Sequence, residues 1–217
     1  MKKIASFVLT TALVLGMGAS AFAAATPSKV VLDEVKADAS VTVSGLSSLI
    51  GAKVEIKKAE EAAKTAEEVK RVEEQTKSVL TDVAANVDLK AAVSEVLPQE
   101  VAAGTGEHGK KEDVKVEVTA VQTFSVETKR LADSAKVEVA LESKMIDTAY
   151  AENEELVVLV AVPKVDAATG KVTYTYTKVK AVYKDGKINV KLTGKQLKTF
   201  GSNFTVMALK QVKHKAV

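Results

Sequence analysis

The most concentrated chemistry in the sequence is a set of lysines near the C-terminus. The stretch TKVKAVYKDGKINVKLTGKQLKTF, residues 177–200, holds seven lysines and one acid, Asp185. The lysines are Lys178, Lys180, Lys184, Lys187, Lys191, Lys195 and Lys198. Ammonium groups attract anions without directional preference, and salt screens that attraction. The pattern predicts either a surface for a polyanion or the solvated face of an ordinary β-hairpin, where lysines also block strand-to-strand aggregation.

Histidine and cysteine chemistry has little support in the sequence. The chain has two histidines, His108 and His214, and no cysteine. A Ser-His-Asp triad needs a histidine held rigidly between nucleophile and acid, which neither a glycine-rich loop nor a chain end provides. His108 has carboxylates near it in GEHGKKED, but zinc sites usually repeat Cys or His at tight spacing. We therefore expect no nucleophilic hydrolase, no metal site and no cofactor.

Three glutamates stand together in AENEEL, as Glu152, Glu154 and Glu155. A glycosidase needs two carboxyl groups that face each other across a cleft. Sugar binding is also expected to use aromatic platforms, and the chain has no tryptophan. We interpret these glutamates as caps of the turn before the apolar run LVVLVAVP.

Tyr174 and Tyr176 alternate with threonines in TYTYT. Such residues form either cross-strand pairs that stabilise a sheet or a ladder on an exposed face that holds a ligand. The first interpretation is favoured, because residues of these types belong more often to a core.

The N-terminal residues predict export. Lys2 and Lys3 precede an apolar run, and Ala21-Phe22-Ala23 matches an A-x-A cleavage pattern, so residues 1–23 are predicted to be a signal peptide. The run is too short for a membrane span, which needs about 20 apolar residues. Without cysteine there is neither a lipid anchor nor a disulfide, so a packed core must stabilise the mature chain. We expect a secreted or cell-envelope-associated protein with no membrane span after cleavage.

The first half of the mature chain predicts two short strands followed by helices. Apolar residues alternate at 41–43 and again at 54–56, and a helical insert is expected at about 58–97, ended by Pro98. A glycine-rich and charged loop is expected at about 102–113.

From residue 114 the apolar period changes to two, and about six strands are predicted. Asp185-Gly186 predicts a two-residue type I′ hairpin turn, and TGKQLKTFG predicts one helical turn closed by Gly201. The economical fold is α+β, an Ig-like antiparallel β-sandwich with a helical insertion after the first strands, in one domain at 24–217. A separate helical domain is the alternative.

The strings VTVSG, GAKVEI, AKVEVALES, LVVLVAVP, VYKDGKINVKL and NFTVMAL resemble immunoglobulin-like modules of exported Gram-positive surface proteins. Those modules often carry a helical stretch between early strands. They serve mostly as stalks and as adhesive or display units. The resemblance implies a bacterial protein with a structural or binding role.

We therefore expect a non-enzymatic binding or structural module of the cell envelope or extracellular space. The sequence does not determine its oligomeric state. Its partner would be an anionic cell-wall polymer, contacted through the lysine-rich C-terminal sheet, or a surface protein. Nucleic acid is not expected, because aromatic residues for base stacking are not interleaved with the lysines. The alternatives are an accessory enzyme or enzyme inhibitor acting on wall or host polysaccharide, and self-assembly into a surface layer.

Overall fold

The structure is a computed structural model that describes residues 35–44, 53–87, 92, 114–129, 131–143, 145–146 and 149–213. The predicted signal peptide and the loop predicted at about 102–113 lie outside these residues. The last part of the predicted helical insert, residues 88–97, also lies outside them except for Ala92.

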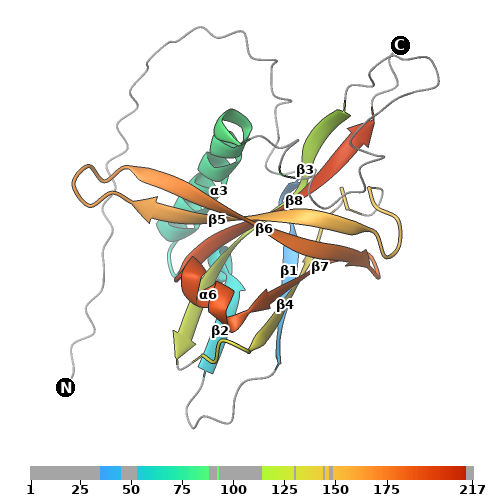
Figure 1. Ribbon diagram of the computed structural model, residues 1–217. Coiled ribbons are helices and arrows are strands. Elements are labelled where there is room, and N and C mark those ends of the chain that lie inside the picture. The colour runs from blue at the N-terminus through green and yellow to red at the C-terminus, as the bar shows by residue number, and fades with distance from the viewer. Residues whose placement is uncertain are drawn as a thin grey trace, which may run out of the picture.

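The elements of the described chain follow the predicted order of early strands, helices and late strands (Figure 1). They are β1 (Asp38–Ser44), β2 (Lys53–Lys58), α2 (Ala59–Ala62), α3 (Ala66–Asn86), β3 (Val114–Lys129), β4 (Lys136–Glu142), β5 (Glu155–Val165), β6 (Val172–Lys184), β7 (Lys187–Thr193), α6 (Gly194–Phe200) and β8 (Asn203–Lys213). None of the described helices is long and apolar enough to cross a membrane.

All eight strands belong to one antiparallel sheet, in the order β1-β4-β7-β6-β5-β8-β3-β2. The predicted β-rich architecture is confirmed. The described strands do not divide into the two packed sheets of a sandwich, so the Ig-like arrangement stays a prediction. The sheet instead curls around its own inner face, and a curled sheet can enclose a core without a second sheet.

The curl brings the two edge strands, β1 and β2, close to each other at one end. The Lys58 Nζ lies 2.6 Å from the Asp38 Oδ1, which joins the end of β2 to the start of β1. Just before β1, the Ala37 N–H donates to the Val121 carbonyl of β3 over 3.0 Å. These contacts make the sheet a nearly closed barrel with a polar seam between its edges.

The inner face of the sheet encloses the larger hydrophobic core. Alternate residues of β4, β6 and β7 point inward, as their burial patterns show. One end of this core is closed by α6, which buries Leu197 and Phe200. The rings of Phe200 and Phe124 lie 5.3 Å and 5.5 Å from that of Phe204, so three aromatic side chains fill this end.

A second hydrophobic cluster lies on the outer face, where α3 packs on β3, β5 and β8. Helix α3 contributes Val79 and Val83, which are both almost fully buried. Strand β5 is covered on both faces: Val158 and Val160 point inward, whereas Val157 points toward the outer cluster. This double burial explains why LVVLVAVP is continuously apolar rather than alternating.

The predicted first helix is interrupted. Ala63 has an extended backbone after α2, and α3 starts behind Thr65, whose Oγ1 accepts a hydrogen bond from the Glu68 N–H over 3.2 Å. A threonine in this role satisfies an N–H that would otherwise lack a partner in the helix. The interruption lets α2 stay beside the seam while α3 turns onto the sheet.

Two local predictions are confirmed at the C-terminal end. Asp185 and Gly186 have φ values of 54° and 76°, as a two-residue hairpin turn of this type requires. Helix α6 ends at Gly201, which has a φ of 77°. Its start is a capping box, in which Thr193 and Gln196 bind each other's backbone N–H groups.

Candidate functional site

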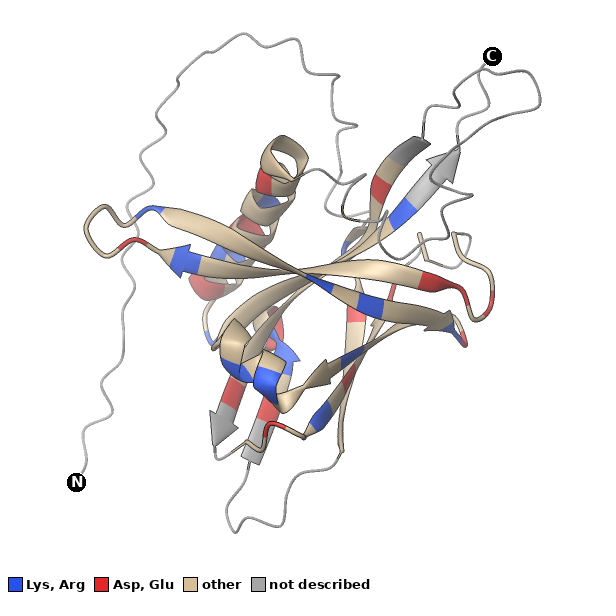
Figure 2. Cartoon of the chain, viewed as in Figure 1, with Lys and Arg blue, Asp and Glu red and all other residues tan. Residues whose placement is uncertain are grey.

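The seven predicted lysines lie on three consecutive elements (Figure 2). Lys178, Lys180 and Lys184 are on β6, Lys187 and Lys191 are on β7, and Lys195 and Lys198 are on α6. On β6 and β7 the buried positions between them, including Ala181 and Val190, face the core. Because side chains alternate across a strand, these lysines point away from the barrel. We call the outer face of β6 and β7 the lysine face.

Acids from other segments pair with some of these lysines. The Lys187 Nζ lies 2.5 Å from Glu142 at the end of β4. The Lys198 Nζ lies 2.6 Å from Asp133 in the segment before β4. Lysines 198 and 195 together hold the pKa of the Asp133 carboxyl below its ordinary value, chiefly through the hydrogen bond from Lys198. Two of the seven lysines, Lys187 and Lys198, are therefore partly neutralised within the protein.

The middle of the lysine face keeps its positive charge. Among the described residues, Lys180, Lys184 and Lys191 form no ion pair, and all three are exposed. Ala181 is paired with Val190, so Lys180 and Lys191 are the next residues along that register. Lys191 is also opposite Glu138 of β4, but the two side chains are not in ion-pair contact.

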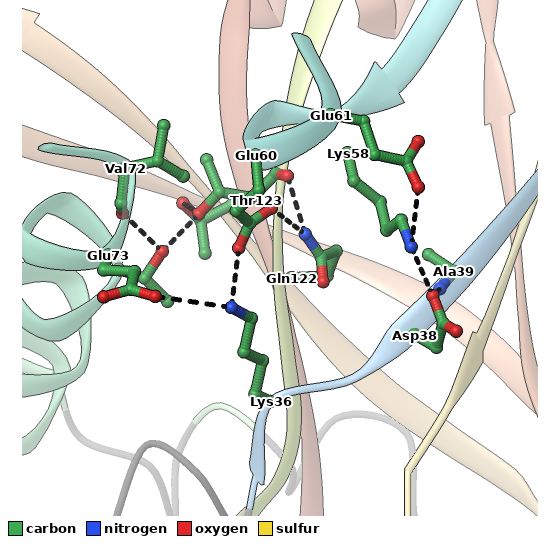
Figure 3. A network of polar contacts seen from close by, with 12 residues as sticks. Lys36, Asp38, Ala39, Lys58, Glu60, Glu61, Val72, Glu73, Gln122 and Thr123 are labelled. Carbon is green, nitrogen blue, oxygen red and sulfur yellow. Dashed lines mark hydrogen bonds and ion pairs between the residues drawn. The ribbon is translucent and has the colours of Figure 1, made fainter. Parts of the chain in front are cut away.

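A second candidate site is the polar seam, where the structure holds a pocket of about 480 Å³. Its lining comes from the segment before β1, the end of β2, α2 and β3 (Figure 3). The charged and polar residues that line it are Lys36, Asp38, Lys58, Glu60, Glu61 and Gln122. Sequence reasoning did not group these residues, because they come from three separate stretches of the chain.

Lys58 organises the outer half of the seam. Its Nζ contacts Asp38 at 2.6 Å and Glu61 at 2.7 Å. The hydrogen bond from Lys58 and one from the Ala39 N–H hold the pKa of Asp38 below its ordinary value. The same hydrogen bonds to Asp38 and Glu61 raise the pKa of Lys58. Asp38 and Lys58 are therefore both held in their charged forms near neutral pH.

Gln122 organises the inner half. This side chain is only 2% exposed, and its Nε2 donates to Glu60 over 2.8 Å and to the Thr123 carbonyl over 3.0 Å. Glu60 in turn contacts Lys36 at 3.3 Å, and Lys36 reaches Glu73 of α3 at 3.8 Å. This network ties β3, α2, α3 and the segment before β1 together.

A chain of buried hydroxyls continues from this network between the helix and the sheet. The Thr76 Oγ1 of α3 lies 2.8 Å from the Thr123 Oγ1 of β3, which lies 2.9 Å from the Thr205 Oγ1 of β8. The polar pair Gln122-Thr123 interrupts the apolar run of β3 (TAVQTFSV), and this interruption was the available sequence signal for the network.

The chemistry of the seam is ion pairing rather than proton transfer. Each lining carboxylate binds a lysine or the Gln122 amide. A general acid needs a raised pKa, and the pKa of Asp38 is lowered instead. In the described ranges no group of three or more His, Asp or Glu side chains has an arrangement for a metal ion.

The other residues considered in the sequence have structural contacts. Tyr174 and Tyr176 are half-buried against the outer hydrophobic cluster, as the core interpretation predicted. Glu154 accepts a hydrogen bond from the Ala151 N–H over 2.7 Å, which confirms its predicted role as a turn cap. Glu152 accepts from the Asp185 N–H in the β6–β7 turn. The histidines and the carboxylates of GEHGKKED lie outside the described residues.

No family model, no curated protein and no solved structure matches the chain.

Proposed function

We propose that the protein is a non-enzymatic binding module of the cell envelope or extracellular space, which holds an anionic polymer such as teichoic acid on the lysine face. The predicted signal peptide supports export. The resemblance to Ig-like modules of exported surface proteins supports a binding or display role. The proposal centres on Lys180, Lys184 and Lys191, because Lys187 and Lys198 already bind Glu142 and Asp133.

The observation that carries the proposal is that Lys180, Lys184 and Lys191 are exposed on the outer face of β6 and β7 and form no ion pair among the described residues. Like charges gathered on one face repel one another, and an opposite charge attracts them. The barrel accepts this repulsion on an exposed face, and an anionic chain lying along the ammonium groups would replace the repulsion with attraction. Val182 lies between Lys180 and Lys184 on the same face and is itself 37% exposed.

The proposal is tested by removing three charges from the lysine face. We expect the triple variant Lys180→Gln, Lys184→Gln and Lys191→Gln to lose most of its binding to purified wall teichoic acid at low salt. The matched control is the triple variant Lys64→Gln, Lys70→Gln and Lys77→Gln, since these lysines are exposed at and near α3 and the charge change is equal. Equal loss in both variants would show that net charge, not this face, accounts for binding.

A further inference from the structure

Strands β5 and β6 continue beyond the rest of the sheet as a two-stranded ribbon (Figure 1). Strand β8 pairs with β5 only at residues 157–161, and β7 pairs with β6 only at residues 181–184. Strands β5 and β6 stay paired with each other out to Val165 and Val172. Both outer edges of the ribbon therefore lack a neighbouring strand among the described residues. Unpaired edges are where a further strand can add.

The two edges of the ribbon differ. Lys184 and Lys187 flank the two-residue turn, so they form a hydrogen-bonded pair. Even-numbered residues of β6 therefore direct their N–H and C=O groups toward the β7 side, and at Tyr174 and Tyr176 that side is open. On β5, Pro163 falls at a position that faces the β8 side, where it has no N–H to offer. A proline is a common device that prevents further pairing at a strand edge.

We propose that the open edge of β6 binds the same edge of a second copy of this chain, antiparallel, around a two-fold axis at Thr175. The sequence from Thr173 to Thr177 reads TYTYT in both directions. In this register Tyr174 faces Tyr176 of the partner, Thr173 faces Thr177 of the partner, and Thr175 faces its own copy. Pairs of aromatic residues and pairs of threonines are both favourable across antiparallel strands.

The register also satisfies hydrogen bonding and charge. Each pairing of Tyr174 with the partner's Tyr176 is a hydrogen-bonded pair, because both residues direct their backbone groups toward the open edge. Lys178 faces Val172 of the partner and Lys180 faces Gly170, so no two lysines stand opposite each other. A two-residue shift that centres the axis on Tyr176 would place Lys178 against Tyr174 and would leave one tyrosine pair, Tyr176 against its own copy, instead of two. The interface is isologous, as expected for a closed dimer.

A second copy fits this edge better than a head-to-tail array does. Pairing of β6 with the β5 edge of the next molecule would meet Pro163, which removes a hydrogen bond from that ladder. On the ribbon face opposite α3, Thr173, Thr175 and Thr177 are exposed, so the edge is accessible from that side.

The absence of cysteine allows a clean cross-linking test. Residues that face each other as a non-hydrogen-bonded pair have Cα atoms about 4.5 Å apart, within the range that a disulfide spans. We expect Thr175→Cys to form an intermolecular disulfide under mild oxidation. Thr173→Cys and Thr177→Cys are the controls. Position 173 faces position 177 of the partner, so a cysteine at only one of these positions has a threonine opposite it. Cross-linking that is equal among the three, or stronger at a control position, would overturn the proposed register.

Sedimentation equilibrium tests association without oxidation. The chain without its predicted signal peptide should move from monomer to dimer mass as concentration rises. Thr175→Lys should remain monomeric, because two lysines would face each other at the axis, whereas Thr173→Lys should still dimerise. Circular dichroism confirms that each variant is folded. A parent protein that stays monomeric at every concentration, or two lysine variants that behave alike, would overturn the proposal.

Discussion

Lys58 at the end of β2 binds Asp38 at the start of β1 over 2.6 Å, and these are the two edge strands of the sheet. The barrel is therefore joined at this end by side-chain charges where a ladder of backbone hydrogen bonds would close a complete barrel. Lys58 also reaches Glu61 of α2, so the same ammonium group fixes the start of the helical segment.

The seam ion pair should make stability depend on acidity. The pKa of Asp38 is lower in the folded protein than in the unfolded chain. Asp38 therefore contributes to the free energy of unfolding above its ordinary pKa near 4, and this contribution is lost as the pH falls through the lowered pKa. Asp38 is largely exposed, so we expect Asp38→Asn to lower the free energy of unfolding by about 0.2–1 kcal/mol at pH 7. In urea titrations the difference should shrink as the pH falls below about 4. Glu74→Gln on α3 is the control, and a difference for Asp38→Asn that does not shrink as the pH falls would contradict this account.

The buried hydroxyl chain should be most sensitive at its middle member. Thr123→Val leaves the Thr205 hydroxyl without its side-chain partner in a fully buried position, so we expect a loss of about 1–3 kcal/mol. Thr205→Val leaves Thr123 still bonded to Thr76 and should cost about 1 kcal/mol. The double variant Thr123→Val, Thr205→Val should lose less than the sum. Strict additivity in urea unfolding would show that the hydroxyls do not interact.

Gly194, at the start of α6, has no room for a side chain. A Cβ atom there would lie 1.9 Å from the Ala132 carbonyl oxygen, which belongs to the backbone. We expect Gly194→Ala to destabilise the protein by about 3 kcal/mol, at the upper end for overpacking. Gly170→Ala is the comparison: nothing lies near its Cβ, but a φ of +68° should still cost about 1–2 kcal/mol. A smaller thermal shift for Gly194→Ala than for Gly170→Ala would contradict this packing.

Tyr176 should anchor α3 to the sheet. Its hydroxyl donates to the Asp82 carboxylate over 2.5 Å, and bonds to charged groups contribute about 1.5–3 kcal/mol when well formed. The contact is only half-buried, so we expect Tyr176→Phe to cost about 1.5 kcal/mol. Tyr174→Phe, which loses a bond to the neutral Ser78, should cost less. Equal urea midpoints for Tyr176→Phe and the parent protein would show that packing alone holds the helix.

Local structure followed from the sequence, whereas the neighbours of each strand did not. The hairpin turn at Asp185-Gly186 and the helix end at Gly201 could be predicted, because only a few residue types tolerate a positive φ. Alternation likewise predicted which face of β7 is buried. Alternation does not state which strand lies beside which, so the single curled sheet, with β1 beside β4, was not predicted.

The same limit applies to the candidate sites. The lysines of β6, β7 and α6 were visible as a composition bias, but the partners Glu142 and Asp133 lie 45 and 65 residues before Lys187 and Lys198. The seam network could not be assembled from the sequence, since Lys36, Glu60 and Gln122 meet only after the barrel has curled. Contacts between residues so far apart depend on topology, which residue type and spacing do not encode.

The most direct test of the proposed function is cosedimentation of residues 24–217 with purified cell walls, with and without their anionic polymers, over a series of salt concentrations. The account predicts that the protein pellets only with walls that keep the polymers, and that pelleting fades as salt rises because screening weakens contacts made by exposed lysines. Protein that stays in the supernatant at low salt, or that pellets equally with stripped walls, would contradict a polyanion-binding role for the lysine face.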